Sequence, residues 1–277
     1  MDFQKLSGAG NDFIIIDNTK ERLPREKLSA VARTLCRRRL SIGADGVMFI
    51  EHSDSCDARM IFFNADGSEG EMCGNGARCV CRYVREHGLA GGEQTIETVS
   101  GVVRGRMVTK RDYTVRLTPP SLVCDSLAVS ALGQKYDCGY VELGRPGLPH
   151  LVLEHPGLRG TPEGEMRALG AALRRAPELE KGANVNFFEL CGDGSVFIRT
   201  FERGVEDFTL ACGTGTAATA LILSRRRLVP REGFTAYMAG GRLIVDIRSE
   251  GGSDAVYLTG PTNVVAEGTV LDEELSI

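Results

Sequence analysis

The sequence contains no tryptophan, only four histidines and no strong excess of charge of either sign. Its 37 acidic and 33 basic residues leave a net charge of −4, which gives no long-range attraction toward nucleic acid or anionic membranes. No uninterrupted apolar run approaches the roughly 20 residues of a membrane-spanning helix. The amino-terminal residues also lack the apolar stretch of a signal peptide. We therefore expect a cytoplasmic protein that binds neither nucleic acid nor membranes.

Metal-binding cysteine spacings are missing as well. The nine cysteines include no C-x-x-C pair, and the four histidines are scattered, so we predict no metal site. An odd number of cysteines in a chain without a secretion signal favours free thiols in a reducing compartment. The sequence thus offers thiols rather than disulfides or metal ligands as its reactive sulfur groups.

An internal repeat predicts the architecture. A shift of 139 residues brings five positions into register: Gly8 with Gly147, Phe62 with Phe201, Cys73 with Cys212, Gly74 with Gly213, and Gly76 with Gly215. Further along, the shift grows by two residues, and Val115–Pro120 matches Val256–Pro261. A repeat of this kind indicates two copies of one folding unit. We predict an amino-terminal domain of residues 1–120 plus 262–277 and a carboxy-terminal domain of residues 121–261, with the unmatched tail 262–277 returning to the first unit.

Both units are predicted to be rich in strands. Short β-branched or aromatic runs between glycine or polar turns are typical of strands, and they occur at residues 13–16, 47–50, 59–63, 102–108, 140–143, 151–153, 185–190, 196–201 and 243–247. Two surface helices are expected at residues 25–37 and 163–175. The predicted fold class is α/β (α+β), with two pseudo-symmetric strand-rich domains. Each domain is expected to wrap a curved mixed sheet around a central helix, with the active site in the cleft between the domains.

Two cysteines precede glycine-rich helix starts, in the segments Cys73-Gly74-Asn75-Gly76 and Cys212-Gly213-Thr214-Gly215. The helix that follows Cys212 is apolar or small nearly all round, as in a buried helix. Free N–H groups and the helix dipole at such a start favour an anion and lower the pKa of a thiol. One such segment alone is more often a tight turn beside a buried cysteine. Its recurrence at equivalent repeat positions favours a functional role.

The paired thiols predict a type of chemistry. Inversion of a carbon centre needs one group that removes a proton from one face and another that delivers a proton to the opposite face. Two like groups related by pseudo-symmetry suit this task, and N–H groups at two helix starts would stabilise the charge that develops on a carboxylate. The two sulfurs share one proton, so their titration belongs to the pair. Which thiol is ionised at rest does not follow from the sequence.

Around these residues the sequence resembles the diaminopimelate epimerases, a pyridoxal-phosphate-independent family of lysine and peptidoglycan precursor synthesis. The resemblance spans nearly the whole chain and includes Ser7–Phe13, Gly43–Gly46, Phe63–Glu69, Met72–Arg78, Pro149-His150, Asn184–Phe187, Glu202–Gly204 and Ala211–Gly215. It implies interconversion of LL- and meso-2,6-diaminopimelate by a thiolate and a thiol, without a cofactor. It also implies a homodimer.

The resemblance further implies a role for individual residues. Cys73 and Cys212 are the base and acid, and His150 and Glu202 tune or orient the thiols. The carboxylate at the reacting centre is held by Gly74, Asn75, Gly213 and Thr214. The distant amino-carboxylate is recognised by Asn11, Asn64, Asn184 and Arg203, with Glu202 also counted among the substrate-binding residues. An arginine fork suits a carboxylate, and asparagines supply both donors and acceptors to a zwitterion.

The sequence departs from the family pattern at Gly46, Leu148 and Phe208, where some members have Gln, Asn and Glu. These departures concern substrate contacts rather than the thiols. A racemase of another amino acid, such as proline, hydroxyproline or histidine, is the main alternative, and its pocket would lack polar groups for a second amino-carboxylate. A phenazine-biosynthesis-type isomerase would use a carboxylate in place of the thiols. A non-catalytic amino-acid-binding protein would not exchange the α-hydrogen with solvent.

Overall fold

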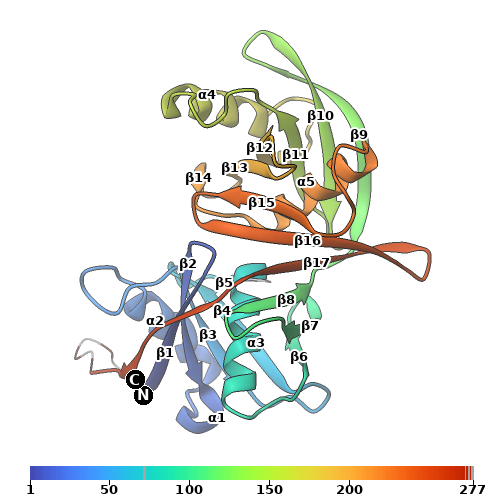
Figure 1. The fold of residues 1–277 in the computed structure, drawn as a ribbon. Helices are drawn as coiled ribbons and strands as arrows, with labels where there is room; N and C mark the ends of the chain where they lie inside the picture. Colours follow the sequence, from blue (N-terminus) through green and yellow to red (C-terminus); the bar gives the residue numbers. More distant parts are fainter. Residues whose placement is uncertain (71–72, 272, 274, 276–277) are drawn as a thin grey trace. The chain divides into compact units, whose positions relative to one another are not determined.

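The computed structural model describes residues 1–70, 73–271, 273 and 275 and divides into two compact units (Figure 1). Unit 1 comprises Met1–Arg116 and Thr259–Ile277, and unit 2 comprises Leu117–Leu258. Strands dominate both units, and few helices accompany them. The predicted class, a strand-rich mixed α/β fold, is confirmed. Among the described residues, no helix is long and apolar enough to cross a membrane.

Unit 1 contains mixed strand pairings. Its strands are β1 (Asp2–Gly8), β2 (Asn11–Asp17), β3 (Gly46–Glu51), β4 (Ala58–Asn64), β5 (Glu69–Gly70), β6 (Glu93–Thr98), β7 (Gly101–Met107), β8 (Asp112–Arg116) and β18 (Asn263–Thr269), and its helices are α1 (Asn18–Glu21), α2 (Arg25–Leu35) and α3 (Gly74–Glu86). Strands β2 and β3 run parallel, as do β4 and β6. The pairs β1–β2, β3–β4, β4–β5 and β6–β7 are antiparallel.

Unit 2 repeats this arrangement. Its strands are β9 (Pro120–Ala131), β10 (Gln134–Leu143), β11 (Leu148–Glu154), β12 (Asn184–Leu190), β13 (Val196–Glu202), β14 (Asp207–Thr209), β15 (Phe234–Met238), β16 (Gly241–Glu250) and the first part of β17 (Ser253–Pro261), and its helices are α4 (Glu163–Arg174) and α5 (Gly213–Arg225). The parallel pairs are β11–β12 and β13–β15. The pairs β10–β11, β12–β13, β13–β14 and β15–β16 are antiparallel, so the pairing pattern of unit 1 recurs.

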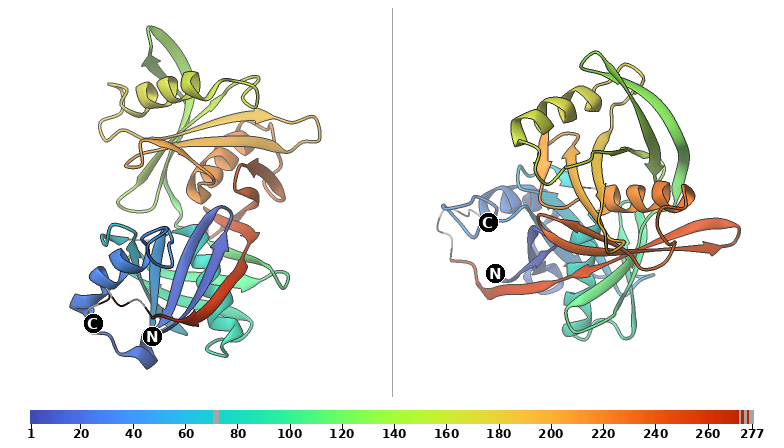
Figure 2. Two further views of the ribbon diagram at one scale, coloured as in Figure 1. Left: turned by 90° about the vertical axis from the view of Figure 1, so that its left-hand side faces the viewer. Right: turned by 45° about the horizontal axis from the view of Figure 1, so that its top comes forward.

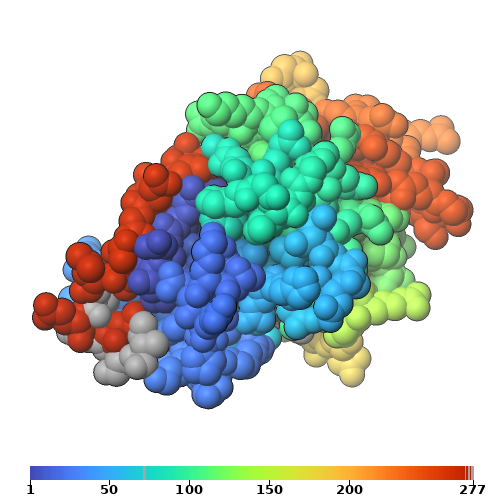
Figure 3. All heavy atoms as spheres, turned by 90° about the horizontal axis from the view of Figure 1, so that it is seen from below, coloured from blue at the N-terminus to red at the C-terminus, as the bar shows by residue number. Residues whose placement is uncertain are grey.

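One strand is added beside the first strand of each repeat, and in unit 1 this strand comes from the far end of the chain. Strand β18 pairs with β1 in unit 1, as β9 pairs with β10 in unit 2. Strand β18 thus forms the edge of the sheet beside β1. Strand β18 lies at the surface of unit 1 beside the amino-terminal strand, with most of its side chains exposed (Figure 3).

A central helix organises each unit, as predicted. Helix α3 packs against β1, β2, β6, β7 and β8, and helix α5 packs against β9, β10, β11, β12 and β16 (Figures 1 and 2). Both helices are buried along nearly their whole length. Glycines permit this close approach at the first turn, because a Cβ at Gly76 would overlap Met48, and one at Gly215 would overlap Asn186.

The predicted elements lie where apolar runs mark them. All nine predicted strands fall within observed strands, except that Val108 follows the end of β7. The two surface helices end two residues and one residue earlier than predicted, at Leu35 and Arg174. The strands that the sequence did not indicate include β1, β9 and β18. Polar residues interrupt all three strands, and some of their apolar residues, such as Leu122 and Val265, are exposed.

The packing of α4 on unit 2 leaves room for a side chain at one glycine but not at another. A Cβ at Gly170 would lie 2.8 Å from the ring of Phe201, whereas a Cβ at the exposed Gly164 meets nothing within 4 Å. We expect Gly170→Ala to destabilise the protein by about 1–3 kcal/mol through overpacking. Gly164→Ala should be neutral or stabilise it by about 0.5–1 kcal/mol, because alanine is the better helix former. Denaturant unfolding of both variants measures the difference; equal midpoints would contradict the packing.

Candidate functional site

Cys212 occupies the predicted helix start in unit 2. It is the N-cap residue of α5, with an extended backbone (φ −124°, ψ 109°). Its buried Sγ accepts a hydrogen bond from the Gly215 backbone N–H at 3.4 Å, and Oγ1 of Thr214 lies 3.5 Å from the same sulfur. The sulfur therefore satisfies one of the N–H groups that a helix start leaves open.

Glu202, the last residue of β13, interacts with this thiol. Its Oε1 accepts a hydrogen bond from Oγ1 of Thr209 at 2.6 Å, and its carboxyl group also hydrogen-bonds to the Cys212 side chain. Burial raises the pKa of Glu202, and burial together with the charge of Glu202 raises the pKa of Cys212. The expectation that the helix start lowers the thiol pKa is wrong for Cys212, because desolvation outweighs the helix field. Cys212 is held as a thiol.

His150 lies on β11 and is completely buried. Its Nδ1 is 3.3 Å from Nδ2 of Asn186, whose amide also donates to the Leu151 carbonyl at 2.8 Å and accepts from Thr200 at 2.9 Å. Burial, and then the charge of Arg203, lowers the pKa of His150 to about 3. The ring is therefore neutral. Because Nδ1 accepts from Asn186, the proton belongs on Nε2, which has no hydrogen-bond partner among the described residues.

Asn184 and Arg203 meet beside His150. Asn184 is the β12 residue that faces His150 in the parallel β11–β12 register. Its Oδ1 accepts a hydrogen bond from the Arg203 backbone N–H at 2.8 Å. The guanidinium of Arg203 donates to the Lys181 carbonyl at 3.3 Å. Unit 2 thus carries seven of the predicted site residues: Cys212, Gly213, Thr214, His150, Glu202, Asn184 and Arg203.

Unit 1 holds the other five predicted residues: Cys73, Gly74, Asn75, Asn11 and Asn64. Cys73 is half-buried and is the N-cap residue of α3. The buried Asn75 donates from Nδ2 to Oδ1 of Asn11 at 2.7 Å, and Asn11 donates in turn to Asp45 at 3.0 Å. Asn64 donates to Oγ of Ser68 at 3.0 Å, and the neighbouring Ala65 N–H donates to the Asp45 carbonyl at 3.1 Å.

Two functional candidates were missed in the sequence. Asp45 accepts hydrogen bonds from Asn11 and from the guanidinium of Arg38, the latter at 2.8 Å. Arg78 is completely buried and bonds to Asn75 at 2.8 Å. Both lie inside segments that carry the family resemblance, Gly43–Gly46 and Met72–Arg78, which is the signal that could have found them. Nothing in the sequence pattern showed that these two charges are joined to the predicted asparagines.

The departures from the family pattern have a structural basis at two of the three positions. The ring of Phe62 and the Phe63 carbonyl fill the space over Gly46, where a Cβ would lie 2.5 and 2.6 Å from them. A longer side chain there would require Phe62 to move. Phe208 packs on the rings of Phe187 and Phe201, and the guanidinium of Arg199 lies 4.4 Å from its ring centre. For Leu148 we have no comparable account.

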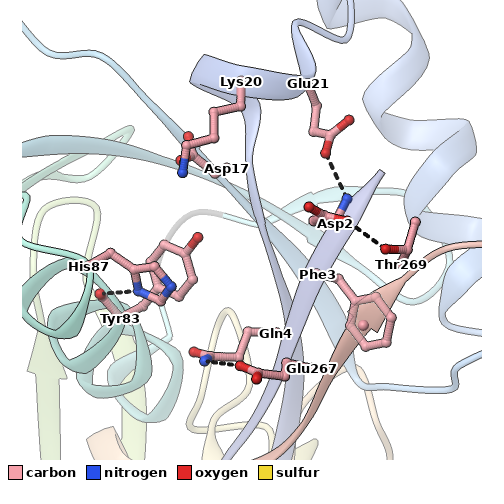
Figure 4. Close-up of a pocket in the computed structure, with 11 residues that line it drawn as sticks. Asp2, Phe3, Gln4, Asp17, Lys20, Glu21, Tyr83, His87, Glu267 and Thr269 are labelled. Atoms are coloured by element: carbon pink, nitrogen blue, oxygen red, sulfur yellow. Dashed lines mark hydrogen bonds and ion pairs between the residues drawn. The ribbon is translucent and has the colours of Figure 1, made fainter.

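A cavity of about 430 Å³ in unit 1 contains none of the predicted site residues (Figure 4). It is lined by residues of β1, α1, β18 and the end of α3, including the stacked rings of Tyr83 and His87. Its polar groups bond to one another, for example Lys20 to Asp17 at 2.8 Å. Within the described residues, no three His, Cys, Asp or Glu side chains are grouped so that they could hold a metal ion.

Solved structures share this duplicated fold. A phenazine biosynthesis protein of the PhzF family from Bacillus anthracis matches with a TM-score of 0.75 at 16% identity, covering 98% of this chain and 99% of its own. A probable proline racemase from Agrobacterium radiobacter K84 matches with a TM-score of 0.67 at 17% identity, covering 99% and 95%. The chain therefore has the same class of fold as these two proteins.

Closer relatives define the family. The family model described as diaminopimelate epimerase matches twice, at residues 3–123 and 145–265. The diaminopimelate epimerase of Aquifex aeolicus is 34% identical, and the match covers 99% of both chains. That of Chlorobaculum tepidum is 36% identical over 96% of this chain and 99% of its own. The chain belongs to the diaminopimelate epimerase family, and it is an isomerase with a small-molecule substrate.

The buried imidazole makes stability depend on pH. The folded protein lowers the pKa of His150 to about 3, whereas an unfolded histidine has a pKa of about 6.5. Below pH 6.5 the unfolded chain takes up a proton that the folded chain does not. The wild type should therefore lose up to about 1.4 kcal/mol of unfolding free energy per pH unit as the pH falls from 6.5 toward 3.

His150→Gln should lack this part of the pH dependence. Denaturant unfolding of the wild type and the variant at several pH values between 7 and 5 gives the difference in slope. Parallel curves for the two proteins would show that His150 titrates normally in the fold.

Proposed function

We propose that this protein interconverts LL- and meso-2,6-diaminopimelate by moving the α-proton between the thiols of Cys73 and Cys212, without a cofactor. The observation that carries the proposal is that each repeat begins its buried central helix directly after a cysteine. Membership of the diaminopimelate epimerase family supports the substrate. A cytoplasmic location and a homodimer accompany the proposal as family expectations, and the dimer is measured by sedimentation.

The reaction transfers one proton to each face of a single carbon. One sulfur, as thiolate, removes the α-proton and becomes a thiol, and the electron pair stays on the substrate. The other sulfur, as thiol, delivers its proton to the opposite face and becomes a thiolate. The reverse reaction exchanges the two roles. This mechanism requires the predicted domains, 1–120 plus 262–277 and 121–261, to bring both sulfurs to the same α-carbon in the active arrangement.

The helix starts would stabilise the intermediate. Loss of the α-proton places negative charge on the adjacent carboxylate, which gains most from N–H donors that are already oriented. The first turns of α3 and α5 supply such donors at Gly74 and Asn75 and at Gly213 and Thr214. Because each helix is fixed by the packing of its own unit, these donors need little reorganisation during the reaction.

Glu202 and His150 would set the state of the sulfurs. The carboxyl group of Glu202 interacts with Cys212 and favours the thiol over the thiolate at this position. His150 is neutral and carries an unpaired donor at Nε2. A buried donor without a partner is costly, so we propose that it donates to a sulfur or to substrate in the active arrangement.

The remaining residues suit a second amino-carboxylate. Arg203 provides a planar fork for a carboxylate, and Asn11, Asn64 and Asn184 provide amide donors and acceptors for an ammonium and a carboxylate. This polar set favours diaminopimelate over proline, hydroxyproline or histidine, each of which has only one amino-carboxylate. The same polar set therefore favours a diaminopimelate epimerase over a racemase of another amino acid that uses the same two thiols.

Incubation with LL-diaminopimelate in heavy water tests the activity. We expect meso-diaminopimelate to form with deuterium on the inverted α-carbon, because the delivered proton comes from a thiol in exchange with solvent. Cys73→Ala and Cys212→Ala should each reduce epimerisation by about 10³-fold or more, because each removes a proton-transfer group. Circular dichroism provides the folding control. A folded Cys→Ala variant with near-normal turnover would refute the two-thiol mechanism.

Mild oxidation tests the distance between the sulfurs. Two thiols that reach one α-carbon come close enough for a disulfide to form. We expect oxidation to join Cys73 to Cys212 and to stop epimerisation, and a reductant should restore it. Peptide mapping identifies the linked pair, and the Cys73→Ala variant serves as the control. Full activity of a protein shown to contain this disulfide would overturn the mechanism.

A further inference from the structure

Arg78 is a buried cation one helical turn after the start of α3, and its side chain bonds back to the first residues of that helix. Its side chain is 0% exposed, although it is among the largest side chains in the protein. Its guanidinium donates to the Gly74 carbonyl at 3.2 Å and to Oδ1 of Asn75 at 2.8 Å, while Nε has no partner in the part of the chain that the structure describes. Among the described residues, it forms hydrogen bonds to neutral oxygens and no ion pair.

A buried cation of this kind is expensive. Burial lowers the pKa of Arg78, yet a guanidinium keeps its proton in proteins. Even a buried ion pair can often be replaced by well-packed apolar residues of similar volume without loss of stability, and an unpaired buried charge lacks the attraction that such a pair gains. A charge that stability alone would not retain, placed beside a candidate catalytic thiol, indicates an anion that forms or binds during the reaction.

The hydrogen bonds of Arg78 also orient the predicted carboxylate-binding residue. Because Oδ1 of Asn75 faces the guanidinium, its Nδ2 faces Oδ1 of Asn11, and Nδ2 of Asn11 then faces Asp45. A cation at one end and a carboxylate at the other thus fix both amides in one orientation. The Gly74 carbonyl is held at the same time.

The second repeat has no equivalent of this cation. The residue 139 positions after Arg78 is Ala217, which is buried in α5. In the same register, Glu202, which interacts with the other thiol, corresponds to the apolar residue Phe63. The two repeated backbones therefore carry different charged groups near their cysteines: the Arg78 cation next to Gly74 and Asn75 in unit 1, and the Glu202 carboxyl group next to Cys212 in unit 2.

We propose that Arg78 is a positioning residue that makes Cys73 the resting thiolate of the pair and leaves the shared proton on Cys212. It acts through its charge and through Gly74 and Asn75, without touching the substrate. This inference rests on the proposed function in treating the two thiols as a pair. After one turnover the proton lies on Cys73 and the negative charge on Cys212, and the field of Arg78 favours the proton's return to Cys212 before the next turnover in the same direction.

Cys79 and Cys81, the other two thiols near Arg78, do not compete with Cys73 to be the resting thiolate. The groups that act on Arg78 are Cys79, Cys73, Cys81 and, least of these, Asp112. Cys79 and Cys81 are completely buried, and burial raises the pKa of each to about 12, so both stay protonated at neutral pH. Cys73, in contrast, is half-buried and is the N-cap residue of α3.

Alkylation of the full-length protein tests the inference without substrate. Iodoacetamide reacts with thiolates, and peptide mass spectrometry gives the rate at Cys73 and at Cys212 as a function of pH. In the wild type we expect the pH midpoint of Cys73 alkylation to lie at least about one unit below that of Cys212. A midpoint for Cys212 at or below that of Cys73 overturns the inference, whatever any variant does.

Arg78→Met and Arg78→Lys separate charge from packing, and Arg82→Gln is the matched control on the same helix. Arg82 bonds to Glu86 and to the Thr262 carbonyl rather than to Gly74 or Asn75. In Arg78→Met the Cys73 midpoint should rise by at least about one unit, and alkylation at pH 7 should slow about tenfold. Arg78→Lys should retain part of the effect, and Arg82→Gln should leave the midpoint unchanged.

Thermal unfolding distinguishes positioning from a merely structural role. We expect Arg78→Met to unfold at or above the wild-type temperature while its kcat falls about tenfold or more. A lower unfolding temperature with an unchanged Cys73 midpoint would overturn the inference. Failure of the wild type to exchange deuterium into diaminopimelate would instead refute the proposed function, and the alkylation result would stand apart from it.

Discussion

The fold depends on burying the amino-terminal end of one helix in each unit. A helix start leaves several N–H groups without partners, and inside a core those groups must meet a hydrogen-bond acceptor or an anion. The first turns of α3 and α5 contain Gly76 and Gly215, which let Met48 and Asn186 pack directly against them. In unit 2 the Cys212 sulfur accepts from the Gly215 N–H. In unit 2 the same sulfur is therefore both the helix cap and a candidate catalytic thiol.

The two repeats share a backbone but not an electrostatic environment. Helices α3 and α5 have the same length and begin after a cysteine, yet α3 carries the buried Arg78 and Arg82 where α5 carries small and apolar residues. In unit 2 the carboxyl group of Glu202 interacts with the sulfur of Cys212. A two-base reaction needs one acid and one base at any moment. In the proposed reaction, the repeated backbone would supply the matched geometry, and the side chains that differ between the repeats would distinguish the acid from the base.

The sequence revealed the buried parts of this fold and little of its surface. Most of the nine strands predicted from apolar runs line the cores, including residues 13–16 and 185–190, whereas residues 102–108 are mostly exposed. Strands β9 and β18 are exposed or half-exposed over most of their length, and their pairing partners define them. The repeat predicted both central helices, because a Cys-Gly-x-Gly segment that occurs twice in one register is a strong local signal.

The site was predictable as a set of residues but not as a set of contacts. The asparagines and thiols were found through recurring or family-like segments. Their partners Asp45 and Arg78 were not singled out, because hydrogen bonds such as those from Asn11 to Asp45 and from Arg78 to Asn75 depend on how strands and helix pack. The raised pKa of Cys212 also required the fold, since only burial and the approach of Glu202 outweigh the helix dipole.

The pairing of the last strand, β18, with the first strand, β1, has a consequence for synthesis of the chain. Strand β1 has β2 on one side and β18 on the other, and the Asp2 and Thr269 side chains that bond across this pairing are 267 residues apart. While the ribosome is still making the second repeat, the outer edge of β1 presents unpaired N–H and C=O groups. Such an edge attracts other strands, and contacts this distant in sequence form slowly. The nascent protein is therefore most exposed to mispairing until its last residues emerge.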